Sequence, residues 1–172
     1  MNGLVWAVAV VLSVALEAAL PVSWTLGRTR APVLLGVVAY YALNRSPRMM
    51  LAAALAGGWL RDSIAGLPLG CSTVGLALVG LILQANRSVI FDRRLATRIV
   101  LGGFSGVVFS LVVYGVLLAT EGLELAVSTS EALGKALGEG VWSLAVLPLA
   151  LVAMERLERM VGNVGGIVHD PG

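Results

Sequence analysis

The side chains that could take part in chemistry are few, and most are acidic residues in or beside apolar segments. Glu17, Asp62 and Glu139 offer a conceivable acid–base pair, but Asp62 directly follows Arg61 and is expected near water. The sequence has no His-Glu-x-x-His motif, no paired-cysteine metal site, no phosphate-binding glycine loop and no Gly-x-Ser-x-Gly elbow. Its single histidine lies near the C-terminus. We therefore expect a protein that is not an enzyme and that needs no cofactor.

The most distinctive stretch is a polar break between two apolar segments, over residues 57–70 (GGWLRDSIAGLPLG). Gly66 and Gly70 can supply positive φ angles, and Pro68 a fixed φ angle, as a sharp reversal requires. Pro68 would also be tolerated in the first turn of the following helix, where its missing N–H removes no hydrogen bond. The stretch predicts a helical hairpin with a stiff turn.

Asp62 has three possible roles at this turn. It could cap the backbone N–H groups of the next turn, pair with Arg61, or lie in solvent as an ordinary carboxylate at a helix end. In the first two cases Asp62 and the turn glycines would be structural residues. The residues expected to form this structural turn motif are Gly58, Asp62, Gly66, Pro68 and Gly70.

Composition indicates the class of protein. Hydrophobic residues make up 58% of the 172 residues and charged residues 13%, with a mean hydropathy of +0.93. Soluble domains have about 45–50% apolar and about 25% charged residues. Lipid must therefore be part of the solvent of this protein. The net charge is +2, and the excess basic residues lie in the loops between the apolar segments. In that position they indicate orientation in the membrane and not nucleic-acid binding.

We expect an all-α integral membrane protein, a compact bundle of six transmembrane helices. The six apolar segments cover about residues 4–20, 31–43, 49–64, 69–83, 99–120 and 133–154. The second segment is short, because its length as a helix is about 20 Å against a hydrocarbon core of about 30 Å. One transmembrane domain over residues 1–160 would be followed by a flexible cytoplasmic tail over residues 161–172.

Two further features concern contacts between the helices. Gly102, Gly106 and Ser110 form a small-xxx-small face, which favours close packing inside the protein and leaves docking of another membrane protein as the alternative. Glu17, near the end of the first segment, is interpreted as an interfacial carboxylate in preference to a buried contact between helices.

The loop charges predict the orientation of the six segments. Lys and Arg residues number 8 on one side (positions 45, 48, 87, 93, 94, 98, 156 and 159) and 4 on the other (28, 30, 61 and 135). Because cytoplasmic loops carry the excess of basic residues, both termini should be cytoplasmic. The turn over residues 62–70 and the acidic segment over residues 121–131 would then face outward, and the basic loop over residues 87–98 would face anionic lipid.

The motif Gly58-Trp-Leu-Arg-Asp62, followed by Gly66-Leu-Pro-Leu-Gly70, resembles that of the bacterial rod shape-determining protein MreD family. The short second segment, preceded by proline, and the basic loop after the fourth segment resemble the family as well. One departure is an N-terminus without the usual basic flank.

The resemblance implies a non-enzymatic scaffold of the elongation complex in the bacterial inner membrane. Such a scaffold maintains cell shape by binding an MreC-like bitopic protein and supporting peptidoglycan synthesis along the side wall. It also implies a RodA-like glycosyltransferase and a penicillin-binding transpeptidase as partners, directly or through the MreC-like protein. The implied fold is similar to the S-components of energy-coupling-factor transporters. The alternative function is therefore a vitamin-binding S-component of such a transporter.

Overall fold

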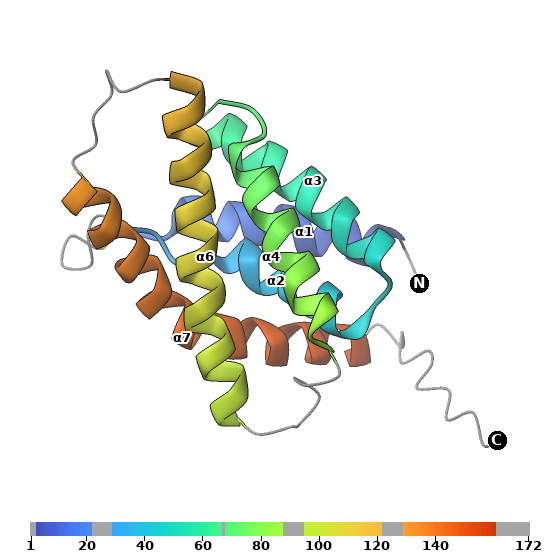
Figure 1. Ribbon diagram of the computed structural model, residues 1–172. Coiled ribbons are helices and arrows are strands. Elements are labelled where there is room, and N and C mark those ends of the chain that lie inside the picture. The colour runs from blue at the N-terminus through green and yellow to red at the C-terminus, as the bar shows by residue number, and fades with distance from the viewer. Residues whose placement is uncertain (1–2, 22–28, 67, 88–94, 122–128, 161–172) are drawn as a thin grey trace.

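The described residues form six helices and no strand (Figure 1). The computed structural model describes residues 3–21, 29–66, 68–87, 95–121 and 129–160. The helices are α1 (Gly3–Ala19), α2 (Val33–Asn44), α3 (Pro47–Ala65), α4 (Cys71–Ala85), α6 (Leu95–Glu121) and α7 (Thr129–Met160). Each helix corresponds to one of the six predicted apolar segments, so the all-α class and the number of helices are confirmed. The predicted tail over residues 161–172, and most of the basic loop and of the acidic segment, lie outside the described residues.

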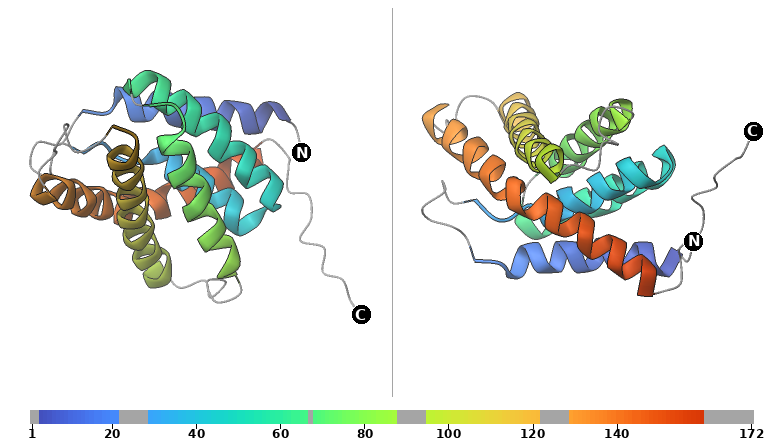
Figure 2. Two further views of the ribbon diagram at one scale, coloured as in Figure 1. Left: turned by 45° about the horizontal axis from the view of Figure 1, so that its top comes forward. Right: turned by 90° about the horizontal axis from the view of Figure 1, so that it is seen from below.

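Helix α2 lies in the centre of the bundle, with nine of its twelve residues buried. The other helices follow one another around it: α1 packs against α3, α3 against α4, α4 against α6, and α6 against α7. Successive helices alternate in direction. The beginning of α1 and the end of α7 lie at the same end of the bundle (Figures 1 and 2).

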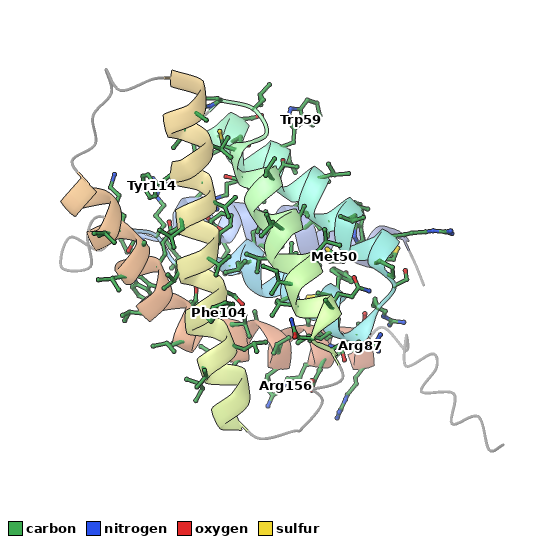
Figure 3. All side chains as sticks on the ribbon, viewed as in Figure 1. Met50, Trp59, Arg87, Phe104, Tyr114 and Arg156 are labelled. Atoms are coloured by element: carbon green, nitrogen blue, oxygen red, sulfur yellow. The ribbon has the colours of Figure 1, made fainter. Side chains whose placement is uncertain are left out.

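Small residues allow the helices to approach closely where α3 meets its neighbours. A Cβ atom at Gly58 would lie 2.6 Å from the Cα atom and 2.7 Å from the backbone nitrogen of Thr73 on α4. A Cβ atom at Gly57 would lie 2.5 Å from a methyl group of Leu34 on the central helix. Met50 fills the space between α3 and α4 at the other end of this helix pair (Figure 3). Such close packing holds helices together in a membrane, because an apolar side chain gains no hydrophobic free energy by moving from lipid into the protein interior.

The predicted small-xxx-small face lies against α7 in this structure. A Cβ atom at Gly102 would meet the backbone oxygen of Ser143, and one at Gly106 would meet the Ser143 side chain and the backbone oxygen of Glu139. Ser110 also contacts Glu139 through its hydroxyl. A face that contacts α7 cannot bind another protein at the same time. Docking of another membrane protein on this face therefore stays a prediction, and it would require α6 and α7 to separate.

Two helices of the described chain are long and apolar enough to cross a membrane, over Ile99–Leu117 of α6 and Leu133–Met160 of α7. Shorter apolar stretches cover Trp6–Ala19, Val33–Asn44 and Cys71–Ala85. Helix α3 has 19 residues but includes two arginines and an aspartate. The helices are therefore confirmed, whereas six complete membrane crossings are not.

The close approach at Gly58 gives a testable consequence for stability. Gly58→Ala places a methyl group into the backbone of α4, so α3 and α4 must move apart, and overpacking of this kind costs about 1–3 kcal/mol. Gly115→Ala is the matched control, because a Cβ atom there meets no atom within 4 Å. We expect a lower midpoint of thermal unfolding in detergent for Gly58→Ala and an unchanged or higher midpoint for Gly115→Ala. Equal midpoints in the two variants would show that α3 and α4 are not this close.

Candidate functional site: a buried charge cluster beside the α3–α4 turn

The turn between α3 and α4 depends on two glycines with positive φ. Gly66 ends α3 with a φ of 66°, and its N–H donates a hydrogen bond to the backbone oxygen of Asp62. Gly70 precedes α4 with a φ of 106°. Both values lie in the region that L side chains rarely adopt, as predicted for these two glycines. Pro68 lies in the turn before α4, which begins at Cys71, and the Cys71 N–H donates to the Pro68 carbonyl oxygen over 3.3 Å.

Asp62 lies completely inside the protein and caps the beginning of α4. Its Oδ2 atom accepts a hydrogen bond of 2.8 Å from the Gly70 N–H, and the Ser72 N–H donates to both carboxylate oxygens over 3.2 Å. The interpretation as a solvated carboxylate is therefore wrong. A negative charge at this position satisfies backbone donors that the helix leaves free and interacts favourably with the helix dipole.

Arg61 forms an ion pair with Glu17 of α1, and not with its neighbour Asp62. The distance from Arg61 Nε to Glu17 Oε1 is 2.8 Å, and both side chains are largely shielded from solvent. The other oxygen of Glu17 accepts a hydrogen bond of 3.3 Å from the Leu34 N–H at the beginning of α2. The favoured interpretation of Glu17 as an interfacial carboxylate is therefore wrong, because α1 packs against α3 so that the carboxylate meets Arg61.

The side of Arg61 toward α6 and α7 is also occupied. Its guanidinium carbon lies 4.7 Å from the centre of the Phe109 ring on α6. The next residue of α6, Ser110, donates a hydrogen bond to the carboxylate of Glu139 on α7. The Arg61 guanidinium and the Glu139 carboxylate attract each other electrostatically.

We call Glu17, Arg61, Asp62, Ser110 and Glu139 the charge cluster. Together with the backbone groups that they bind and the Phe109 ring beside Arg61, these residues bring all six helices of the described chain together. The sequence identified Asp62 and Ser110 as candidate site residues, whereas the connection from Arg61 to Glu17 was missed. The available signal was that Arg61 and Glu17 are charged residues inside or beside apolar segments, and such residues need partners.

A second ion pair lies at the opposite end of α2. Arg45 Nη2 contacts Glu158 Oε2 over 2.6 Å, which joins the end of the central helix to the last turns of α7. From the sequence, Arg45 was interpreted only as an orientation signal, so this contact was missed too. Breaking one partner of a shielded pair of this kind leaves an uncompensated charge.

The arrangement offers little to a substrate or a metal ion. Among the described residues, no three His, Cys, Asp or Glu side chains are grouped so that they could hold a metal. One hollow of about 10 Å³ lies beside Phe104 and Ser105. A groove of about 490 Å³ between Trp59 and Leu69 is open and lined almost entirely by apolar atoms. The carboxylates of the charge cluster face other helices, so their evident role is to hold helices together.

Charged residues within membrane-spanning helices face the bundle interior and pair with one another or with backbone groups, as the charge cluster does here. The model of the rod shape-determining protein MreD family matches residues 1–153 of the chain. The chain therefore belongs to the MreD family, which consists of membrane proteins that determine rod shape and is not a known enzyme family. No curated protein and no solved structure matches the chain. The expected similarity to transporter S-components is thus not confirmed.

The ion pair at the centre of the cluster can be tested by a double-mutant cycle. Arg61→Met leaves the buried Glu17 carboxylate without its cation, which costs about 3–5 kcal/mol of unfolding free energy. Glu17→Gln should also destabilise, and the double variant should be more stable than the sum of the single effects predicts. Arg156→Gln, at an exposed position on α7, is the control and should be nearly neutral. Additive effects in an unfolding titration in detergent would contradict the pairing.

Proposed function

We propose that this protein is a non-enzymatic scaffold of the elongation complex in the bacterial inner membrane. In this proposal it crosses the membrane six times and binds an MreC-like bitopic protein. Through that contact, or directly, it supports a RodA-like glycosyltransferase and a penicillin-binding transpeptidase that extend the side wall. Membership of a family that determines rod shape supports this proposal at the level of cell shape.

The proposal rests on the partners of the buried charged side chains, which are other groups of the protein itself. Intramembrane charged residues usually serve transport, catalysis or assembly. Here the Asp62 carboxylate binds backbone N–H groups, and Arg61 binds Glu17 between helices. These contacts make the bundle a stable body that can present constant surfaces to partners, which is what a scaffold requires.

The arrangement of the helices favours six crossings with both termini in the cytoplasm. Successive helices alternate in direction, and the beginning of α1 lies at the same end of the bundle as the end of α7 (Figure 1). Arg45 and Arg156 belong to this end, which the distribution of basic residues assigns to the cytoplasm. The turn with Gly66 and Gly70 then faces the periplasm.

The alternative function, a vitamin-binding transporter subunit, gains no support from the described residues. Small-ligand sites are concave and have volumes of about 300–1,000 Å³, with a few polar groups that orient the ligand. The groove beside Trp59 reaches that size only as an open, nearly apolar surface. We therefore do not propose a transport function.

The scaffold proposal predicts a stable complex with the bitopic partner. We expect the wild-type protein to co-purify in about equal amounts with a co-expressed MreC-like protein after solubilisation in mild detergent. Gly66→Val forces a β-branched residue to a φ of 66°, so the turn is strained and less folded protein should accumulate. Pro68→Leu should act in the same direction by loosening the turn. Recovery of the partner should fall with both variants.

Ala65→Val is the matched control for the turn variants, because Ala65 is exposed and lies within the helical part of α3. It should leave both protein level and partner recovery near wild type. Normal levels and normal recovery for Gly66→Val and Pro68→Leu would contradict a structural role of the turn. Absence of the partner from the wild-type preparation would contradict the scaffold function itself.

A further inference from the structure

We infer that this protein thins the lipid bilayer on one side, along α1, α3 and α4. The inference rests on the proposed six-span arrangement and goes beyond it. The observation behind it is that the apolar length of the helices differs between the two sides of the bundle. The partner implied by this surface is an annulus of lipid that is thinner than the surrounding membrane.

The lipid-facing helices fall into a short and a long group. Helix α1 covers Gly3–Ala19 and the apolar stretch of α4 covers Cys71–Ala85, which correspond to about 25 Å and about 22 Å of helix. In α6 the stretch Ile99–Leu117 corresponds to about 28 Å, and in α7 the apolar part before the charged last turns, residues 133–154, corresponds to about 33 Å. The hydrocarbon core of a typical bilayer is about 30 Å thick. The short group is therefore several ångströms too short, whereas the long group is not.

The short helices are neighbours and do face lipid. Helix α3 packs between α1 and α4, and α6 and α7 complete the ring on the other side. Large apolar side chains of α1 and α4 are exposed, among them Leu12, Leu16, Leu78 and Leu81. The central helix α2 is shorter still, but it is buried and its length does not affect the lipid.

The charge cluster explains why these helices end at one level. Glu17 lies near the end of α1, Arg61 and Asp62 near the end of α3, and Ser72 at the beginning of α4. The ion pair and the cap bring these ends together. Extending one of these helices at this end would move its charged group away from its partners, so the fold fixes the level of this end.

Helix α3 carries its own markers of the membrane boundaries. Arg48 is exposed near its beginning, and Trp59 is exposed eleven residues later and points away from the bundle (Figure 3). Tryptophan and arginine prefer the interfaces of a bilayer. Eleven residues correspond to about 17 Å of helix, which places α3 in the short group with α1 and α4.

Tilt of the helices increases the mismatch between the bilayer thickness and the apolar length of the protein on this side. Helices α1 and α6 cross steeply in Figure 1 and in the left view of Figure 2, so both cannot stand along the membrane normal. Tilting shortens the projection of every helix on the normal, which accommodates the long α7 but further reduces the height of the short group. A bilayer responds to a short hydrophobic surface by thinning locally.

The test compares the lipid preferences on the two sides of the same protein. Trp59, on α3, becomes the only tryptophan of the protein after the other three are replaced by phenylalanine. The matched reporter is a variant with F104W in a background without other tryptophans, because Phe104 is similarly exposed on α6. Each variant is reconstituted into mixtures of brominated and unbrominated phosphatidylcholines with myristoleoyl, oleoyl or erucoyl chains. Fluorescence quenching then gives the relative binding constants of the lipids at each site.

We expect Trp59 to report a preference of about twofold or more for the short myristoleoyl chain over the oleoyl chain. The F104W reporter should prefer the oleoyl chain or bind the two equally. The same ranking of chain lengths at both sites would overturn the inference and leave the six-span arrangement intact. Quenching of Trp59 by aqueous iodide but by no brominated lipid would overturn the six-span arrangement, and the inference with it.

Discussion

The structure depends on one pair of adjacent residues of opposite charge, Arg61 and Asp62, near the end of α3. In lipid, apolar side chains are as well solvated outside the protein as inside it, so close packing and polar contacts must specify how helices associate. Asp62 fixes the beginning of α4, and Arg61 fixes α1 through Glu17 and contacts α6 through the Phe109 ring. Because the two side chains leave one helix in different directions, a single turn of α3 determines the positions of its neighbours.

The same pair explains how two helices can begin inside the protein. The residues that precede α2 and α4 are Pro32 and Gly70, and neither supplies a side-chain cap. The free N–H groups of Leu34 and Ser72 are bound instead by carboxylates from other helices. Buried backbone donors without a partner are costly. The caps therefore make the short helices possible and bind the bundle together at the same time.

Much of the fold could be predicted from the sequence because the controlling features are local. Runs of apolar residues, interrupted by glycine, proline and charge, mark the six helices to within a few residues, and Gly66 and Gly70 mark the reversal between α3 and α4. The motif from Gly58 to Gly70 also pointed to the correct family. The number of membrane crossings does not follow from the same features, since apolar length alone singles out only α6 and α7 in the described chain.

The charge cluster could be predicted only in part, because its contacts join distant positions. Glu17 lies 44 residues before Arg61, and Arg45 lies 113 residues before Glu158, so spacing along the chain does not indicate that they meet. For Asp62, three roles remained open until the position of α4 was known. Charged residues in apolar segments nevertheless showed where partners were needed, and this is the signal to pursue in related sequences.

Amide hydrogen exchange at Leu34 and Ser72, in the intact protein in lipid nanodiscs, tests the central claim most directly. The first N–H groups of a helix ordinarily have no partner within the helix and exchange quickly. Capping by Glu17 and Asp62 predicts that these two amides are protected about as strongly as amides in the middle of α2 and α4. Rapid exchange at both positions, with protection beginning only one turn later, would contradict the account.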